Sequence, residues 1–314
     1  MALIIAEDNT LHFPKKTETE DLKGKLIIGA TSVSVFLIIA VLFVILGIIV
    51  YEGWHTFSWE FITSFPTDGM TKGGIFPAII GTFILVIVMA LAAVPFGTIT
   101  AIYLTEYARE NSVIAAAVRF SVRTLAVVPS IIFGLFGLGF FIQFVGAGAD
   151  NVFYNGQLHW GQPNILWASL TMALLTLPVV IVSVEEALKT VPRELREASL
   201  ALGATKWQTI RKVVLPGSVS GIMTGTILAV SRGAGEVAPI LFTGAAYYLA
   251  TLPKSVSDQF MNLGYHIYIM STQSADVEKT MPIQFATTLV LLMLTFSLNI
   301  AAIAIRSRIR RNKK

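Results

Sequence analysis

Cysteine is absent from this sequence of 314 residues, and charged side chains make up only 13% of it. The absence of cysteine excludes disulfides, thiolate metal sites and cysteine nucleophiles. Soluble globular domains contain roughly 25% charged residues, whereas this chain is 54% hydrophobic and has a mean hydropathy of +0.72. A compact core cannot hide that many apolar side chains, so we expect lipid to surround much of the chain.

Histidine is also scarce. The four histidines lie far apart and outside the long apolar runs, at His12, His55, His159 and His266. Their spacing does not resemble the closely spaced ligand pairs of a metal site. We interpret each as an ordinary polar surface residue, and we expect neither a metal site nor a catalytic cluster.

The apolar residues form six runs separated by short polar segments. The runs span approximately residues 26–50, 75–104, 122–145, 165–184, 217–243 and 283–305. A hydrocarbon core of about 30 Å needs roughly 20 helical residues, and a segment in lipid must satisfy its own backbone hydrogen bonds. The sequence therefore predicts an all-α integral membrane protein with six transmembrane helices. The first run is too long for the apolar part of a signal peptide, so we expect it to be retained.

Lysine and arginine are distributed unequally between alternate segments. The segments before the first run, between the second and third, between the fourth and fifth, and after the sixth hold 4, 3, 6 and 6 of the 23 basic residues. The other three loops hold 1, none and 2, and Arg232 lies inside a run. Basic segments stay in the cytoplasm. We therefore expect a cytoplasmic N-terminal segment at residues 1–25 and a basic cytoplasmic tail at residues 306–314.

The loop of residues 185–216 is the most regularly patterned polar stretch. Apolar residues recur at helical spacing after Pro192, and Gly203 is the expected left-handed stop of that helix. Thr205 and Gln208 form a capping box for a second helix. The loop is expected to be a helix-turn-helix on the membrane surface. DNA binding is disfavoured because the second helix leads directly into the fifth run, and a plain surface element would need no particular sequence.

Part of this loop resembles the EAA loop of ABC importer permeases. That pattern runs Glu-Ala-Ala, three residues, Gly, nine residues, Ile, one residue, Leu-Pro. The matching residues here are Glu197, Ala198, Ser199, Gly203, Val213, Leu215 and Pro216. Ser199 replaces the second Ala and Val213 replaces Ile, while the spacing is kept across twenty residues.

In that family the loop is the coupling helix, which sits in a cleft of a separate ATPase subunit. The resemblance implies a type I ABC importer permease fold, with five core helices at residues 70–305 behind an outer first helix at residues 26–50. It implies that the residues that couple to the ATPase are Glu194, Glu197, Ala198, Ser199, Leu202, Gly203, Leu215 and Pro216. The sequence contains no Gly-x-x-x-x-Gly-Lys-Ser/Thr phosphate loop, so we expect no enzymatic activity and no bound cofactor in this chain. ATP and Mg would be used by the partner ATPase.

Small residues recur every four positions along the fifth run, at Gly217, Gly221, Gly225, Ala229 and Gly233. Such a row lets a second helix approach closely, which is how helices associate in lipid without a hydrophobic driving force. Helix packing is the role that we expect for the glycines.

A neighbouring stripe carries polar side chains at Ser220, Thr224, Arg232 and Glu236. Arg232 and Glu236 are four residues apart, so their side chains can meet on a helix. A charge at the bilayer centre costs about 2.5 to 3.5 kcal/mol on insertion scales. The pair should therefore face protein or a water-filled path, either as a structural ion pair or as a charged station on the route of an anion.

The stretch from Arg232 to Pro239, Arg-Gly-Ala-Gly-Glu-Val-Ala-Pro, is similar to the Arg-x-x-Gly-Glu-Thr-Ala-Pro stretch of the A-type permease subunits of bacterial phosphate ABC importers. Val237 replaces the usual Thr. Two further stretches also look like that subunit, Tyr103-Leu104-x-Glu106-Tyr107 and Val128-Pro129-Ser130-Ile131. The resemblance implies phosphate import across a prokaryotic inner membrane, with Arg232 and Glu236 in the substrate path and Ser220 and Thr224 as further candidates.

The same resemblance implies the partners. A C-type permease subunit would complete a heterodimeric pore, two copies of one ATPase would dock on the coupling helices, and an extracytoplasmic binding protein would deliver phosphate. No nucleic acid partner is expected. Transport would proceed by alternating access.

Three alternatives belong to other classes. A permease for another oxyanion, such as sulfate or molybdate, shares the fold and the loop. An ion-coupled secondary transporter could use the same charged pair, but it should carry an inverted repeat and has no use for the loop. An intramembrane enzyme would need a catalytic cluster inside the runs, which contain no His, no Cys and no paired Asp.

Overall fold

The computed structural model describes residues 18–311, with the exception of residues 71, 110, 250 and 275. Most of the expected N-terminal segment, residues 1–17, and the last three residues of the expected basic tail lie outside the described residues. The chain divides into two compact units, residues 1–49 and 50–314.

The first unit is dominated by α1 (Glu18–Trp54), which continues into the start of the second unit. Its sequence from Gly24 to Trp54 is long and apolar enough to cross a bilayer. Large apolar side chains such as Leu26, Phe36 and Phe43 are exposed along this helix. A helix that is apolar all round is suited to lipid, so α1 matches the expected first span. The helix begins eight residues before that span and ends four residues after it.

The second unit begins with short elements that precede the helical bundle. They are α2 (Trp59–Thr63), β1 (Pro66–Thr67), η1 (Asp68–Met70) and β2 (Lys72–Gly73). The two strands pair antiparallel, with Pro66 opposite Gly73 and Thr67 opposite Lys72. The remaining elements are α3 (Phe76–Ile102), η2 (Tyr103–Tyr107), α4 (Val113–Leu125), α5 (Ser130–Phe136), η3 (Gly137–Gly146), α6 (Ala147–Phe153), α7 (Ile165–Lys189), α8 (Arg193–Ala201), α9 (Lys206–Thr209), η4 (Ile210–Val214), α10 (Leu215–Gly235), α11 (Leu263–Thr272) and α12 (Val277–Arg311).

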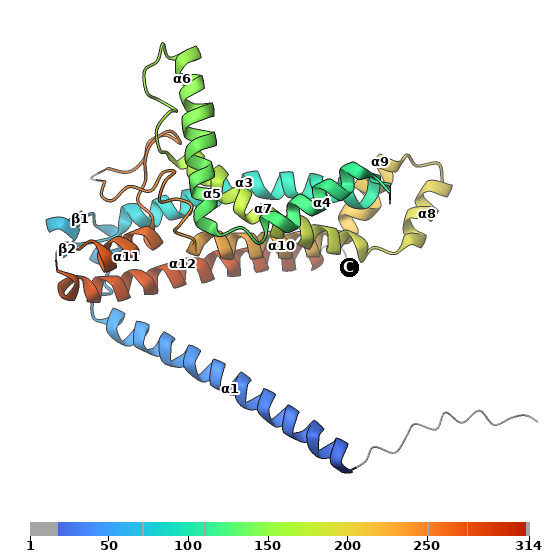
Figure 1. Ribbon diagram of the computed structural model, residues 1–314, viewed down its shortest axis with the longest axis horizontal. Helices are drawn as coiled ribbons and strands as arrows, with labels where there is room; N and C mark the ends of the chain where they lie inside the picture. The colour runs from blue at the N-terminus through green and yellow to red at the C-terminus, as the bar shows by residue number, and fades with distance from the viewer. Residues whose placement is uncertain (1–17, 71, 110, 250, 275, 312–314) are drawn as a thin grey trace, which may run out of the picture. The chain divides into compact units, whose positions relative to one another are not determined.

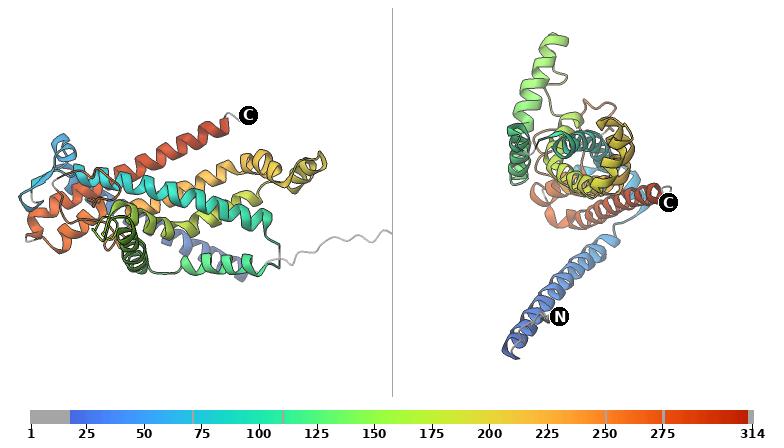
Figure 2. Two further views of the ribbon diagram at one scale, coloured as in Figure 1. Left: turned by 90° about the horizontal axis from the view of Figure 1, so that it is seen from above. Right: turned by 90° about the vertical axis from the view of Figure 1, so that its right-hand side faces the viewer.

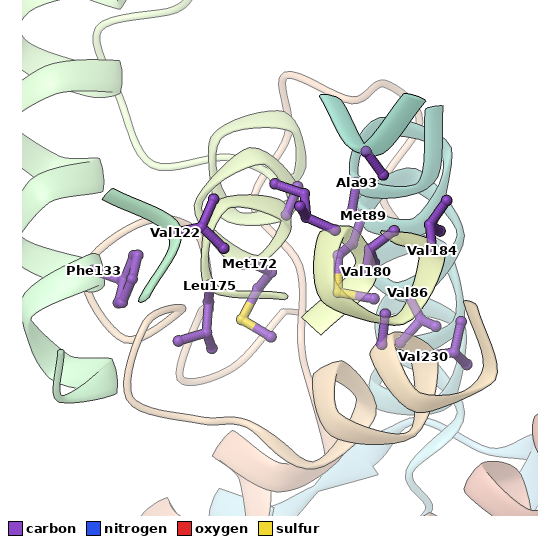
Figure 3. Packing of buried hydrophobic residues seen from close by; sticks show 14 of the residues in the cluster. Val86, Met89, Ala93, Val122, Phe133, Met172, Leu175, Val180, Val184 and Val230 are labelled. Atoms are coloured by element: carbon purple, nitrogen blue, oxygen red, sulfur yellow. The ribbon is translucent and has the colours of Figure 1, made fainter. Parts of the chain in front are cut away.

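The long helices α3, α7, α10 and α12 lie side by side and form a bundle (Figure 1). The helices α8 and α9 lie at one end of this bundle, and α11 and the β1–β2 hairpin lie at the other (Figures 1 and 2). The core of the bundle is built from the facing apolar side chains of α3, α7 and α10, among them Met89, Met172 and Val230 (Figure 3). Of the candidate membrane spans in the described chain, α7 is the most buried.

Six helices of the described chain are long and apolar enough to cross a membrane, which confirms the expected number. They are Gly24–Trp54, Phe76–Tyr107, Ser130–Phe153, Ile165–Lys189, Lys206–Gly235 and Val277–Ile309. Four of these agree with the expected runs apart from their ends. The third and the fifth are displaced along the sequence from the expected runs.

The expected third span, residues 122–145, is wrong at both ends. The helix α4 is separate and is capped by Ser112, whose hydroxyl accepts a hydrogen bond from the backbone N–H of Ala115 at 3.3 Å. The span itself begins only at Ser130, because Pro129 cannot donate a backbone hydrogen bond and disfavours a helical conformation at Val128. It then continues to Phe153, so part of the expected loop of residues 146–164 is helical.

The expected fifth span, residues 217–243, is displaced towards the N-terminus. The helices α9, η4 and α10 form one continuous rod from Lys206 to Gly235. Pro216 does not break it, because the π-helical turn η4 directly before α10 is the kind of local adjustment that accommodates proline in a membrane-spanning helix. At the other end Glu236 has an extended conformation, with φ of −80° and ψ of 136°. Pro239 follows three residues later, and a proline there would oppose any continuation of the helix.

The glycine row of the fifth span faces α7 and α3. A Cβ atom added at Gly221 would lie 2.2 Å from the Cβ of Ala187, and one added at Gly225 would lie 2.8 Å from the Cβ of Ser183. Gly217 faces Val191 at the end of α7, and Gly233 faces the sulfur of Met89 on α3. The spacing of four residues therefore places α10 in direct contact with both neighbouring helices.

The expectation of a surface position for every histidine is wrong at His266. This residue lies in α11 and only 3% of it is exposed. Its Nδ1 has no hydrogen-bond partner among the described residues. Removal from water disfavours the charged form, which lowers the pKa of His266 to about 4 and keeps the imidazole neutral.

We expect Gly221→Ala to destabilise the folded chain, because its methyl group has no room against Ala187. Overpacking of a tight core costs roughly 1 to 3 kcal/mol. Gly139→Ala is the matched control, since no atom from another part of the described chain lies within 4 Å of a Cβ built there. Thermal unfolding of both variants in detergent, followed by size-exclusion chromatography, measures the difference. Equal melting temperatures would contradict the tight contact.

Candidate functional site

The helix α8 projects from the end of the bundle with none of its nine residues buried. Gly203 ends it in the left-handed conformation, with φ of +82°. The backbone N–H of Gly203 donates to the carbonyl of Leu200 at 2.9 Å, and that of Ala204 donates to the carbonyl of Ser199 at 3.2 Å. Glycine adopts this φ without a steric penalty, so the sequence sets the turn that redirects the chain into α9.

The helix α9 begins at the predicted capping box. The hydroxyl of Thr205 accepts from the backbone N–H of Gln208 at 3.2 Å, and the side-chain oxygen of Gln208 accepts from the backbone N–H of Thr205 at 2.8 Å. The hydroxyls of Ser199 and Thr209 lie 2.9 Å apart and join α8 to α9. The turn between the two helices is therefore held from both sides, and α9 runs on into α10.

An ion pair fixes the base of α8 to the rest of the bundle. Nη2 of Arg196 donates to Oε1 of Glu106 in η2 at 3.0 Å, and only 18% and 10% of these two side chains are exposed. The same guanidinium donates to the carbonyls of Leu188 and Val191 at the end of α7. Arg196 thus connects α8 with η2 and with the end of α7. Hydrogen bonds to charged groups contribute about 1.5 to 3 kcal/mol each when they are sheltered from water.

The segment η2 also contacts α9. Nζ of Lys206 lies 5.0 Å from the centroid of the Tyr107 ring, within the range of a cation–π interaction. Glu106 therefore holds α8 through an ion pair, and Tyr107 holds α9 through a cation–π contact. The helices α8 and α9 together are called the projecting segment. In the sequence, Glu106 and Tyr107 are indicated only by the family resemblance. Their role was missed because residues 106 and 196 are ninety positions apart in the chain.

Large apolar side chains are exposed on the projecting segment. Leu202 is 89% exposed, and Leu195, Leu200 and Trp207 are each about half exposed or slightly more. The three leucines lie outside the candidate membrane spans, and Trp207 lies in the first turn of the span that begins at Lys206. Such a patch marks an interaction surface when it is rimmed by polar residues, and Glu194 and Glu197 are also exposed on α8.

The structure does not place all of the predicted coupling residues on this surface. Glu194, Glu197, Ala198, Leu202 and Gly203 are exposed, and Ser199 is partly buried by its contact with Thr209. Leu215 instead packs against the main hydrophobic core, and Pro216 lies in the first turn of α10. The last two residues shape the start of α10 rather than the projecting surface.

Arg232 and Glu236 meet at the other end of α10. Nε of Arg232 lies 3.5 Å from Oε1 of Glu236, and 45% and 23% of their side chains are exposed. The neighbouring residues orient Arg232, because the hydroxyl of Ser231 is 2.6 Å from Oδ1 of Asn299 on α12 and Gly233 contacts Met89 on α3. The guanidinium is left on a partly uncovered side of α10, in a long contact that another anion can replace.

Ser220 and Thr224 do not join this pair. The Ser220 hydroxyl accepts a hydrogen bond from Nε of Arg306 on α12 at 3.0 Å, and the Thr224 hydroxyl donates to the carbonyl of Ser220 at 2.9 Å. Twelve residues of helix separate Ser220 from Arg232, which is about 18 Å at 1.5 Å per residue. Among the described residues, the predicted polar stripe therefore consists of one charged pair and a separate contact between α10 and α12.

Comparison with known proteins gives a consistent family assignment. Residues 93–311 match the family described as binding-protein-dependent transport system inner membrane component. A probable ABC transporter permease protein of Bacillus subtilis, YqgI, is 30% identical over 263 residues, which cover 80% of this chain and 84% of that protein. The phosphate transport system permease protein PstA of Haemophilus influenzae is 33% identical over 246 residues, which cover 78% of this chain and 80% of that protein.

A solved structure supports the fold. The crystal structure of a bacterial ABC transporter that imports the acidic polysaccharide alginate contains a chain similar to this one, with a TM-score of 0.61 at 16% identity. The similarity covers 92% of this chain and 98% of that chain. The arrangement of helices is therefore that of an ABC importer permease, as the fold prediction from the sequence implied.

We expect Glu106→Gln to loosen α8, because the partly buried guanidinium of Arg196 would lose its counter-charge. Amide hydrogen exchange in peptides that cover residues 193–209 should become about tenfold faster, the equivalent of about 1.4 kcal/mol. Glu186→Gln, which removes the exposed pair with Lys189, is the control and should leave that exchange unchanged. Equal exchange in all three proteins would show that the pair does not hold the helix.

Proposed function

This chain belongs to the family of binding-protein-dependent transport system inner membrane components, and on that premise we propose that it is a permease subunit of an ATP-driven phosphate importer. It would form half of a translocation pore and take its energy from a separate ATPase. The observation that carries the proposal is the exposed α8, which is joined through α9 and η4 to α10, the helix that carries Arg232 in its last turn.

The proposed orientation follows the distribution of basic residues. The end of the bundle that carries α8 and α9 also carries the end of α12 (Figure 2). The segments of residues 185–216 and 306–314 hold 12 of the 23 basic residues, and the segment of residues 105–123 holds 3 more. Basic segments remain in the cytoplasm. The projecting segment would therefore face the cytoplasm, where an ATPase with bound ATP and Mg can reach it. This chain itself would bind neither.

Two copies of the ATPase would dock, one on this chain and one on a second permease. The exposed Leu202 and Trp207 supply the apolar contact, and Glu194 and Glu197 form its polar rim. On the partly uncovered side of Arg232 we place the second, C-type permease, which would complete the path. An extracytoplasmic binding protein would deliver phosphate at the opposite end.

Phosphate as the substrate is supported by the Arg232–Glu236 pair and by the relatives that are named phosphate permeases. A guanidinium binds phosphate through two parallel hydrogen bonds, and the attraction is stronger where water is partly excluded. Arg232 alone would retain the anion. Glu236 competes for the same guanidinium at 3.5 Å, so the anion is held weakly enough to leave.

The orientation predicts the labelling pattern of single cysteines introduced into the cysteine-free chain. In intact cells, cysteines at the exposed positions Asn155 and Ser255 should react with a membrane-impermeant thiol reagent, whereas a cysteine at Asn111 should react only after the membrane is opened. Labelling of Asn111→Cys alone in intact cells would reverse the topology.

The docking role predicts that Glu197→Lys and Gly203→Pro uncouple the ATPase. The first reverses a charge on the exposed face of α8, and the second places proline, which needs a φ near −65°, at a φ of +82°. We expect ATP-driven uptake to fall at least tenfold, while the chain still inserts. Arg308→Glu, an exposed charge reversal on α12 outside α8 and α9, is the control. Normal uptake by both α8 variants would contradict the docking role.

The transport role of the charged pair predicts different defects for its two members. Arg232→Gln should lower phosphate uptake at least tenfold with normal complex yield, because one charge-assisted contact is worth about 1.5 to 3 kcal/mol. Glu236→Gln should slow release, so that phosphate stays longer in the complex. Arg308→Gln is a control of equal charge change outside the pair. Uptake and complex yield are measured together in reconstituted vesicles.

If Arg232 and Glu236 had a purely structural role, the same variants would give another result. Both single changes would then lower complex yield, and the charge-swapped variant Arg232→Glu/Glu236→Arg would restore transport as well as yield. Full transport by the charge-swapped form would exclude the role in anion passage. Equal uptake of sulfate by the native complex would instead assign the chain to another oxyanion.

A further inference from the structure

A groove lined by basic side chains lies beside the base of α8. It has a volume of about 550 Å³ and lies between η2, α4, the end of α7 and α8. Its basic lining residues are Arg109, Arg119, Lys189, Arg193 and Arg196, and these residues define the basic groove. A second cavity of about 210 Å³ adjoins it and shares Leu104, Arg119 and Lys189.

Some of the positive charge around the basic groove is already neutralised. Arg196 pairs with Glu106, Arg119 lies 3.4 Å from Glu185, and Lys189 pairs with Glu186. Three guanidinium groups that line the two cavities have no ion-pair partner among the described residues, namely those of Arg109, Arg123 and Arg193.

The acidic lining residues do not cancel this charge. Of the glutamates that line the two cavities, Glu197 is the one without an ion-pair partner in the described chain. Three unpaired cations against one unpaired anion leave a surplus of two positive charges. Such a surplus favours an anion with several acceptor oxygens, because guanidinium groups bind phosphate through paired hydrogen bonds.

The adjoining cavity has an apolar wall, formed by Leu104, Val122, Ile181 and Val182. Val182 is about half exposed, so this wall continues onto the surface of α7. The membrane-crossing stretches of α3 and α7 end at Tyr107 and Lys189, beside the groove. The two cavities therefore lie where hydrocarbon meets headgroups, with apolar residues next to the hydrocarbon and cations beyond it.

We infer that the basic groove binds the phosphate of an anionic phospholipid, with its acyl chain along the exposed Val182. Basic pockets between helices at a membrane surface bind anionic headgroups. A free phosphate ion has the same charge chemistry but no use for the apolar wall, which favours the lipid. The inference does not depend on which solute the chain transports.

The bound lipid connects elements that move relative to one another when α8 is displaced. Arg109 follows η2 and Arg193 begins α8, so one headgroup between them links α8 to the end of α3. Arg196 and Glu106 make the same link from inside the groove. An anionic lipid therefore provides a second link that holds α8 to η2, and its presence stabilises one position of α8.

The test measures binding of short-chain phosphatidylglycerol to the full-length chain in a neutral detergent by native mass spectrometry. We expect Arg109→Gln/Arg193→Gln to raise the dissociation constant about thirtyfold, on the basis of about 1 kcal/mol for each basic residue near a lipid headgroup. Both side chains are exposed, so the variant should fold normally. Arg211→Gln/Lys212→Gln removes two exposed charges from η4, outside the groove, and should change binding less than threefold.

Several outcomes would overturn the inference. Equal weakening by both double variants would show unspecific attraction to charge, and phosphatidylcholine that binds as tightly as phosphatidylglycerol would exclude headgroup recognition. Inorganic phosphate that displaces the lipid at millimolar concentration would assign the groove to a soluble anion. If the double variant were not monodisperse, Arg109→Gln and Arg193→Gln would be measured singly, with about a fivefold effect expected from each.

Discussion

The contact between α10 and α7 is the constraint on which the other features of this chain depend. Helices in lipid gain little from burying apolar surface against each other, so close approach of their backbones must supply the attraction. Gly221 and Gly225 permit that approach at Ala187 and Ser183. Because α10 is continuous with η4 and α9, the same contact positions the projecting α8 at one end and Arg232 at the other.

The sequence predicted the features that depend on local chemistry. Six apolar runs, the left-handed Gly203 and the capping box of Thr205 are each determined by a few neighbouring residues, and the structure contains all of them. The predicted bounds of the third and fifth spans were wrong, because hydropathy cannot distinguish an apolar residue in a helix from one beyond its end. Pro129 was the local signal for the third span.

Long-range pairing was the part that the sequence could not supply. Glu106 and Arg196 form a partly buried ion pair that holds α8, yet nothing in either local sequence indicates the other. The same limit applied to Ser220, which shares a helical stripe with Arg232 but bonds to Arg306 on α12. A stripe on one helix shows which residues face the same way, whereas the neighbouring helix decides what each of them contacts.

The unbroken rod from Lys206 to Gly235 has a mechanical consequence. From Trp207 to Arg232 it extends for about 38 Å at 1.5 Å per residue, so a tilt of about 5° around one end displaces the other by about 3 Å. Arg232 and Glu236 both lie at that end of the rod, so they would move together. The displacement exceeds the 2.6 Å between the Ser231 hydroxyl and Oδ1 of Asn299 on α12. A small rotation imposed on α8 is therefore sufficient to shift the charged pair relative to α12 without unwinding any helix.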